Sequence, residues 1–520
     1  MFRKNTITLF LIFFLALGLR FYNLSNKVVW YDEADSIASS TRTIVFYQDR
    51  ELIYKPLYFI LLKLWIYLFG VSALWLRMFS VILGTASVYF FYLLGREIFE
   101  EKLGLLSAFL LAISPFHIYY SQQIRQFTLV TLLAIISLYF FILYLKHQKL
   151  KYCALNLFFS ALLITAYPYG IIFVANLTSM LYLAHTKHRN LFISAFVIVL
   201  SLSLIIITVS SLSFIREITW WIERPNLLTL KEIFSVFIMG GENYGLGRGS
   251  LFKEVYEEFE LLRLVDIVGL FLIIPIFIRG IYLLSKKDLI RKGLIIFFFF
   301  TTILVLALSF FIFNFLIIKH LIIILPAFLL IVSYGLLSLR KKLMYSAFFL
   351  LTLISSLSLC GVFIFDLNIN WKHPADLIRL LGKRNDTIIL VTDKEIAPFL
   401  YYFRKPERSM LSDINYCGKI ENGKYLDIFD EQYYRIVLIK ERRSRDCNQL
   451  KADFLNKLSI FSNNERIWLL ASRYVSPEDV DFMKSNLIER GFLVWTSVNM
   501  NGVSTMLLTK NSYKNAQKEF

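Results

Sequence analysis

The chain has 520 residues, of which 57% are hydrophobic and 50 are phenylalanine, and its formal net charge is +18. A soluble protein of this length would form about three domains, but three soluble cores could not hide so much apolar surface. Repeated apolar runs of helix length, separated by short Lys and Arg clusters, indicate instead a helical protein that crosses a membrane many times. Because the basic residues lie between these runs, they indicate membrane topology and argue against a nucleic-acid partner.

About eleven apolar runs are candidates for membrane-spanning helices. They lie near residues 6–22, 75–95, 103–116, 126–145, 152–167, 171–184, 191–213, 264–284, 293–314, 320–338 and 344–366. Arg3 and Lys4 precede the first run, so we expect the N-terminus in the cytoplasm, and later clusters such as 340–342 fall on the same side. An odd number of spans then places the C-terminus outside. The apolar segment 57–69 is too short to cross a bilayer and is expected to lie in its interface.

Hydrophobicity falls in the last third of the chain, and the pattern changes to short strands and helices. Residues 387–392, 435–440 and 466–471 are apolar runs typical of buried strands. Ser476, followed by proline, predicts a helix start, Gly491 predicts its end, and Gly502 after asparagine predicts a hairpin. The sequence therefore predicts a mainly α membrane protein with a membrane domain over 1–366 and a small extracytoplasmic α/β domain over 367–520.

Asp32 and Glu33 follow an aromatic pair just beyond the first apolar run. One interpretation is that they are solvated loop charges at the level of the lipid headgroups. The other is a general base, because a carboxylate at the interface could take a proton from an acceptor hydroxyl. No metal-ligand set is predicted. A divalent cation at Asp32, Glu33 and Asp35 stays an open alternative, although no histidine supports these acids.

Several cations fall at predicted span ends on the same outer side as the acids. They are Lys55, Arg125 and Lys319, the last with His320 beside it, and the Tyr167–Tyr169 turn is expected on the same face. Each cation by itself is typical of a snorkelling side chain. Together they are what a phosphate-bearing lipid needs, since Lys and Arg bind phosphate. Ionisable groups at a membrane interface therefore indicate a candidate functional site.

A long outer loop is predicted over residues 214–263 and contains the adjacent Trp220 and Trp221. Tryptophan pairs at this level are usually interfacial anchors, and the alternative is that they stack on a sugar. Long loops in compact proteins often act as lids or binding loops. Both tryptophans are therefore substrate-binding candidates.

Four motifs in order carry a family resemblance: Trp30-x-Asp32-Glu33, Lys55-Pro56-Leu57-Tyr58, Leu76-Arg77-x-x-Ser80-x-x-x-Gly84 and Ser121-Gln122-x-x-Arg125. This order resembles the GT-C membrane glycosyltransferases, and most of all the glycosyltransferase family 39-like group, with protein O-mannosyltransferases and aminoarabinose transferases as relatives. The resemblance covers about residues 1–185 and continues weakly through Lys319 and His320.

The resemblance implies an enzyme of the plasma membrane that takes a sugar from a polyprenyl- or dolichyl-phosphate. It transfers the sugar, with inversion, to a hydroxyl of a lipid, glycan or protein outside the cytoplasm. Asp32 is implied as the catalytic base, with Glu33 second. The substrate-binding candidates are Lys55, Tyr58, Gln122, Arg125, Trp220, Trp221, Lys319 and His320. No cofactor is implied by the resemblance, and a divalent metal stays an open alternative.

Two other classes of protein are alternatives. A transporter or flippase of a lipid-linked saccharide would hold its ionisable groups near the bilayer midplane, at broken helices, whereas these groups lie at predicted span ends. A non-catalytic membrane protein that binds carbohydrate would do so through its outer domain alone. The identities of the sugar and the acceptor do not follow from residue types.

Overall fold

The computed structural model describes residues 2–41, 55–183, 190, 224–226, 228–240, 260–311, 316–364, 369–391, 396–404, 420–421, 424–425, 428–431, 434–439, 447–461, 464–472, 475–500 and 502–510. The chain divides into two compact units. The helical unit comprises Met1–Ser25, Arg50–Trp65 and Leu74–Leu367, and the α/β unit comprises Asn26–Asp49, Ile66–Ala73 and Asn368–Phe520.

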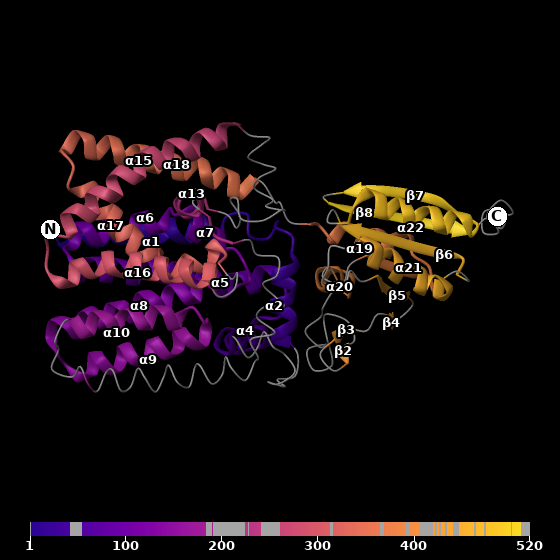
Figure 1. Ribbon diagram of the computed structural model, residues 1–520, viewed down its shortest axis with the longest axis horizontal. Helices are drawn as coiled ribbons and strands as arrows, with labels where there is room; N and C mark the ends of the chain where they lie inside the picture. Colours follow the sequence, from indigo (N-terminus) through magenta and orange to yellow (C-terminus); the bar gives the residue numbers. More distant parts are fainter. Residues whose placement is uncertain are drawn as a thin grey trace. The chain divides into compact units, whose positions relative to one another are not determined.

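The helical unit is built from long apolar helices (Figure 1). They are α1 (Phe2–Phe21), α4 (Pro56–Phe69), α5 (Ala73–Ile98), α6 (Glu101–Ala112), α7 (Pro115–Ser121), α8 (Phe127–His147), α9 (Leu150–Ala166), α10 (Gly170–Leu183), α13 (Leu228–Met239), α15 (Glu260–Leu284), α16 (Leu289–Phe311), η1 (Ile318–Ile324), α17 (Leu325–Leu337) and α18 (Lys341–Ile364). Every predicted span within the described residues coincides with one or two of these helices, and the run near 191–213 lies outside them. By length and composition, six helices of the described part could cross a membrane, or seven if a bent pair counts as one. The total of eleven stays a prediction.

Two predicted spans are not single straight helices. The run near 103–116 is interrupted, because Ser114 caps a new helix and Pro115 occupies its first position, where it cannot continue α6. Helices α6 and α7 consequently meet at 58°. The run near 320–338 begins as the 3₁₀ helix η1 before Pro326 enters α17. The expectation of one loop over 214–263 was also wrong, since α13 occupies part of it.

Close helix packing in this unit depends on glycine. A Cβ on Gly104 of α6 would lie 2.8 Å from the amide nitrogen of Arg96 in α5. A Cβ on Gly335 of α17 would lie 2.1 Å from the carbonyl oxygen of Ile276 in α15. Small residues let helix backbones approach closely inside a membrane, where van der Waals packing drives association.

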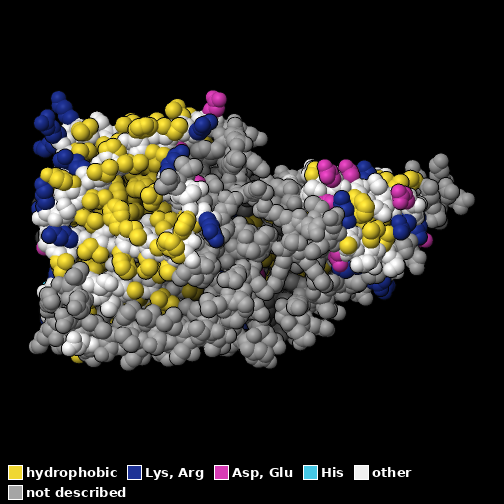
Figure 2. Space-filling view, in the orientation of Figure 1, with side chains coloured by type: hydrophobic (Ala, Val, Ile, Leu, Met, Phe, Trp, Pro, Cys, Tyr) yellow, Lys and Arg dark blue, Asp and Glu magenta, His cyan; other side chains and the backbone are white. Residues whose placement is uncertain are grey.

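The surface of the helical unit is that of a membrane protein. Hydrophobic side chains cover much of its outer face in Figure 2, and Lys and Arg gather at the end that carries the N-terminus. Large apolar side chains such as Phe271, Phe311 and Phe349 are between 66% and 80% exposed. A soluble protein rarely exposes a continuous apolar band of this kind, so the protein is integral to the membrane.

The α/β unit is organised on a six-stranded sheet of order β4-β5-β1-β6-β8-β7. Its strands are β1 (Thr387–Val391), β4 (Ile428–Glu431), β5 (Tyr434–Ile439), β6 (Arg466–Ser472), β7 (Phe492–Met500) and β8 (Val503–Lys510); β2 (Ile420–Glu421) and β3 (Lys424–Tyr425) form a separate pair. Strand β1 lies parallel to β5 and β6, and the other pairings are antiparallel. The three predicted strands are confirmed as β1, β5 and β6, and the predicted hairpin as β7 and β8.

Helices cover both faces of this sheet. Ile389 and Val391 share a core with α21 (Cys447–Phe461) and α22 (Pro477–Glu489). Ile388 and Leu390 share a second core with α19 (Lys372–Leu381) and α20 (Ile396–Arg404). Alternate residues of a strand face opposite sides of the sheet. Since helices cover both sides, every residue of β1 is buried.

A short helix from the N-terminal part of the chain also belongs to the α/β unit. Helix α2 (Tyr31–Thr41) packs against α20. The backbone N–H of Val29 donates to the hydroxyl of Tyr402 at 2.5 Å, and the hydroxyl of Tyr401 donates to the carbonyl of Val71 at 3.1 Å. The contacts thus add segments 26–49 and 66–73 to the C-terminal unit, and the domain boundary at residue 366 stays a prediction.

Candidate functional site

The predicted catalytic acids lie in a helix and not in a loop. Asp32 and Glu33 occupy the first turn of α2, where the helix dipole favours negative charge. The side chain of Asp32 is half-buried, whereas Glu33 is only 1% exposed. Asp32 and Asp35 are three positions apart and lie on one face of the helix, whereas Glu33 points in a different direction. Within the described residues, no group of three His, Cys, Asp or Glu side chains could hold a metal ion.

One predicted cation, Lys319, lies close to the start of α8 in the helical unit. The ammonium of Lys319, in η1, lies 6.0 Å from the ring centroid of Phe127. Phe127 is the first residue of α8 and follows the nearly buried Arg125 by two positions. The structure therefore brings the neighbourhoods of Lys319 and Arg125 together, although they are far apart in the sequence.

His320 lies beside the Tyr167–Tyr169 turn. Its Nδ1 is 2.9 Å from the hydroxyl of Tyr169, and the two ring centroids are 4.8 Å apart. The rings of Tyr167 and Tyr169 stack at 5.4 Å. Burial, with a smaller effect of Tyr167, raises the pKa of the Tyr169 hydroxyl well above its usual value, so this group keeps its proton and can donate it in a hydrogen bond. We call Arg125, Phe127, Tyr167, Tyr169, Lys319 and His320 the cation–tyrosine cluster.

We call the last turn of α8 and the junctions α15–α16 and α17–α18, which carry Lys146, Lys287 and Lys341, the basic turns. The cation–tyrosine cluster lies at the opposite end of α8 from them. Lys146, in the last turn of α8, pairs with the carboxylate of Glu97 at 3.0 Å. A helix of 21 residues is about 32 Å long at 1.5 Å per residue, which is close to the thickness of the bilayer hydrocarbon core. The cluster and the Lys146–Glu97 pair are therefore separated by a helix that is about as long as the hydrocarbon core is thick.

The remaining predicted binding residues lie in different parts of the chain. The side-chain amide of Gln122 donates to the carbonyls of Arg20 at 3.1 Å and Tyr22 at 2.8 Å, so it caps the end of α1. Tyr58 is fully buried in α4, and the half-buried Lys55 directly precedes that helix. Substrate contacts of these three residues stay predictions. Trp220 and Trp221 lie outside the described residues.

The sequence analysis missed a buried polar network at the break between α6 and α7. Arg20 is fully buried at the end of α1. Its guanidinium donates to the carbonyls of Leu111 at 3.0 Å and Ala112 at 3.1 Å, and lies 2.8 Å from Nδ1 of His117. Because arginine only donates hydrogen bonds, Nδ1 of His117 accepts, and the ring proton is on Nε2. A lone arginine at the end of the first apolar run is the signal that could have revealed this network.

Gly84 allows the network to form. A Cβ on Gly84 would lie 2.3 Å from the hydroxyl oxygen of Ser121 and 3.3 Å from Nε of Arg20. The Ser121 hydroxyl in turn donates to the carbonyl of His117 at 2.7 Å. The network thus joins α1 and α5 to α7 and orients the turn that leads to Arg125.

These features define the class of protein: a helical membrane protein with a broken helix, a cluster of cationic and tyrosine side chains near the start of α8 and a small α/β unit. A family model described as dolichyl-phosphate-mannose-protein mannosyltransferase matches residues 55–214. This match confirms the predicted family resemblance over that region, which includes Lys55 and Arg125. Asp32, Glu33 and Lys319 lie outside it. No curated protein matches the chain by sequence.

Solved structures with a similar fold include a protein bound to undecaprenyl phosphate and an archaeal oligosaccharyltransferase. ArnT from Cupriavidus metallidurans, bound to undecaprenyl phosphate, superimposes with a TM-score of 0.57 at 10% identity over 96% of this chain and 97% of that chain. The apo oligosaccharyltransferase of Archaeoglobus fulgidus gives 0.55 at 11% identity, over 96% of this chain and 74% of that chain. The same archaeal enzyme in complex with an inhibitory peptide and a dolichol-phosphate gives 0.51 at 12% identity, over 97% and 74% of the two chains. The predicted GT-C-like fold is confirmed.

Proposed function

We propose that this protein is an integral membrane glycosyltransferase that takes a sugar from a polyprenyl- or dolichyl-phosphate. It transfers the sugar, with inversion, to an acceptor hydroxyl on the outer membrane face. The observation that carries the proposal is the cation–tyrosine cluster, which gathers cations and hydrogen-bonding side chains at one membrane surface. The family match over 55–214 and the lipid phosphates bound by ArnT and the archaeal enzyme support a lipid-phosphate donor.

The cluster suits the departure of the lipid phosphate. When the bond between the anomeric carbon and the phosphate oxygen breaks, its electron pair stays on that oxygen, where negative charge develops. Lys319 and Arg125 would stabilise this charge, and cations placed where charge develops lower the barrier. The donor's tail remains in lipid while its phosphate lies at the surface, which is the level of the cluster.

The second part of the proposal is the base. The acceptor oxygen attacks the anomeric carbon from the side opposite the phosphate, and a carboxylate takes the hydroxyl proton. Asp32 is the better candidate because it is half-buried and can receive an acceptor, whereas Glu33 is only 1% exposed. The mechanism requires the Asp32 carboxylate to lie at the acceptor hydroxyl when both substrates are bound.

The proposed orientation follows the positive-inside rule. The basic turns and the N-terminus lie in the cytoplasm, and the cluster and the α/β unit lie outside. We further propose that 1–366 forms the membrane domain and 367–520 an outer domain. That arrangement places the reaction in the cell envelope, where the acceptor is a lipid, a glycan or a protein.

The base assignment is tested by Asp32→Asn in the purified full chain, assayed with a panel of polyprenyl-phosphate sugars. We expect transfer to fall by about 10²–10⁴-fold, the usual contribution of a general base. Asp35→Asn is the matched control, because Asp35 is also half-buried in α2 and carries the same charge. Full activity of Asp32→Asn, alone and combined with Glu33→Gln, would refute the assignment.

The role of the cluster is tested by Lys319→Met, with Lys146→Met as the control at the opposite end of α8. Loss of a charge-stabilising donor typically lowers turnover by about a hundredfold or more, so Lys319→Met should do so and Lys146→Met should not. Equal effects of the two substitutions would show that the cluster has no special role. A wild-type protein that moved the donor across vesicles without transferring sugar would support the flippase alternative instead.

A further inference from the structure

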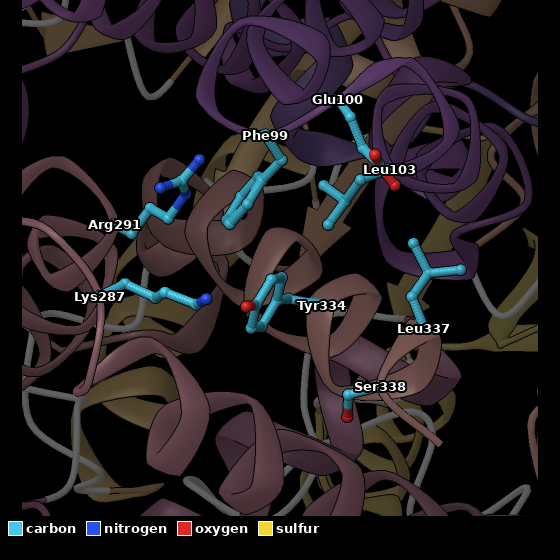
Figure 3. Close-up of a pocket in the computed structure, with 8 residues that line it drawn as sticks. All are labelled: Phe99, Glu100, Leu103, Lys287, Arg291, Tyr334, Leu337 and Ser338. Carbon is cyan, nitrogen blue, oxygen red and sulfur yellow. The ribbon is translucent and has the colours of Figure 1, made fainter. Parts of the chain in front are cut away.

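A pocket lies among the basic turns of the helical unit, at the end away from the cation–tyrosine cluster. It encloses about 370 Å³, which is within the usual size of a small-ligand site. Figure 3 shows its walls: the rings of Phe99 and Tyr334, the charged ends of Lys287 and Arg291, and the side chains of Leu337 and Ser338. Nothing in the proposed transfer reaction uses this pocket.

The pocket has a fixed aromatic wall. The rings of Phe99 and Tyr334 stack with their centroids 5.0 Å apart, although the two residues belong to different parts of the chain. The guanidinium of Arg291 lies 5.5 Å from the Phe99 ring centroid and also pairs with Asp288. Two contacts therefore hold Arg291 in place, which distinguishes it from a freely moving surface cation.

The rim of the pocket is cationic. Lys287 is exposed and Arg291 half-buried at the mouth. Arg279 also reaches this site, since its Nε donates to the hydroxyl of Ser338 at 2.7 Å. Glu100 is the one acidic side chain among the pocket's lining residues in the described part of the chain. With Arg279 included, and with Asp288 counted because it pairs with Arg291, three cations and two acids surround the site. This excess of positive charge favours an anionic ligand, and a phosphate oxygen is the usual partner of such cations.

The position of the pocket favours a lipid over a soluble anion. It lies at the turn between α15 and α16, where the chain leaves the apolar helices. Ile278 and Tyr282 of α15 are each 58% exposed, and Phe299 of α16 is 38% exposed, so apolar surface continues along both helices. The ammonium of Lys286 lies 3.9 Å from the Tyr282 ring centroid, a pairing suited to the headgroup level. Acyl chains could lie on this surface while the headgroup enters the pocket.

We propose that this pocket binds the phosphodiester headgroup of an anionic phospholipid in the leaflet on the side of the basic turns. Lys287 and Arg291 bind the phosphate, and the acyl chains follow the exposed faces of α15 and α16. Basic pockets between membrane helices bind such headgroups for the same electrostatic reason. This inference does not depend on the proposed transferase activity.

The experiment uses the full chain in phosphatidylcholine nanodiscs, titrated with phosphatidylglycerol and read out by native mass spectrometry of the retained lipid. The double variant Lys287→Gln/Arg291→Gln should bind phosphatidylglycerol about thirtyfold more weakly, from about 1 kcal/mol for each basic residue. The control is Lys341→Gln/Lys342→Gln, which removes the same charge at the same end but outside the pocket lining. Equal weakening by both double variants would overturn the proposal, because it would mean that surface charge alone attracts the lipid.

Two further experiments test whether the lipid occupies this pocket and whether the bound phosphate belongs to a lipid or to a soluble anion. Leu337→Trp fills the pocket without changing any charge and should also reduce lipid retention, whereas unchanged retention would overturn the pocket as the site. Glycerol 3-phosphate, added to protein in neutral nanodiscs, should not displace the lipid at comparable concentration. Displacement by this soluble anion would show that the pocket takes a free phosphate and refute the lipid assignment. Thermal unfolding of each variant confirms that it is folded before binding is compared.

Discussion

Replacing Arg20 by methionine should destabilise the helical unit more than replacing any exposed arginine. Arg20 is fully buried and donates to the carbonyl of Ala112 at 3.1 Å, where α6 ends. Its guanidinium also lies 2.8 Å from Nδ1 of His117 in α7. Methionine matches the length of the apolar stem but cannot donate, so it leaves these acceptors without their arginine partner in a water-poor environment.

The size of the destabilisation follows from the acceptors that lose their arginine donor. Leaving a buried acceptor unsatisfied costs about 1–3 kcal/mol, so the Ala112 carbonyl and His117 together cost about 2–6 kcal/mol. Removing a buried guanidinium also relieves its own desolvation cost, which offsets part of this loss. We therefore expect Arg20→Met to destabilise the protein by about 3 kcal/mol, with Arg20→Lys in between because an ammonium reaches fewer acceptors.

Thermal unfolding of the full chain in one detergent provides the measurement. Arg279→Met is the matched control: Arg279 makes two hydrogen bonds to Ser338 but is exposed. Its loss should cost less than about 1 kcal/mol, as for other exposed polar contacts. Equal unfolding temperatures of Arg20→Met and Arg279→Met would show that Arg20 does not stabilise the broken helix.

Two other substitutions test the packing of each unit. Gly84→Ala should destabilise the protein by about 1–3 kcal/mol, because its Cβ would lie 2.3 Å from the Ser121 hydroxyl. The control Gly18→Ala should be tolerated, since a Cβ there meets nothing within 4 Å. Equal unfolding temperatures of the two variants would contradict this expectation. In the α/β unit, Asp386 is 2% exposed and accepts from Arg466 Nε at 2.9 Å and Trp468 Nε1 at 2.9 Å. Asp386→Ala should cost about 3–5 kcal/mol, because it leaves a buried cation unpaired, and should increase proteolysis within 369–510. Unchanged protease resistance would refute that expectation.

Local sequence patterns predicted most of the elements. Apolar run length identified the helices that the structure contains, and short continuous apolar runs identified the buried strands β1, β5 and β6. Ser476 and Gly491 were correct boundaries of α22, since Ser476 accepts from the N–H of Asp479 at 3.1 Å and Gly491 has a φ of +87°. These signals succeed because helix caps and hydrophobic periods depend only on neighbouring residues.

Other features needed the tertiary structure. Hydropathy could not show that α6 and α7 bend at Ser114, because it measures how apolar a run is and not the direction of its axis. It could not show that Asp32 and Glu33 start a helix packed on α20, since that helix is stabilised by contacts with residues more than 350 positions away. Nor could it pair His320 with Tyr169, which are separated by 151 residues.

The sequence by itself determined that the chain is a helical membrane protein, where its basic turns lie and which charged residues stand at helix ends. Each of these follows from the free-energy cost of placing polar groups in lipid, which depends on the type of each residue. The tertiary structure alone decided which of those charges share a site. Lys319 lies beside Phe127, two residues after Arg125, and Arg20 is buried beside His117, because helix packing joins distant segments through shape and hydrogen bonds that no local pattern encodes.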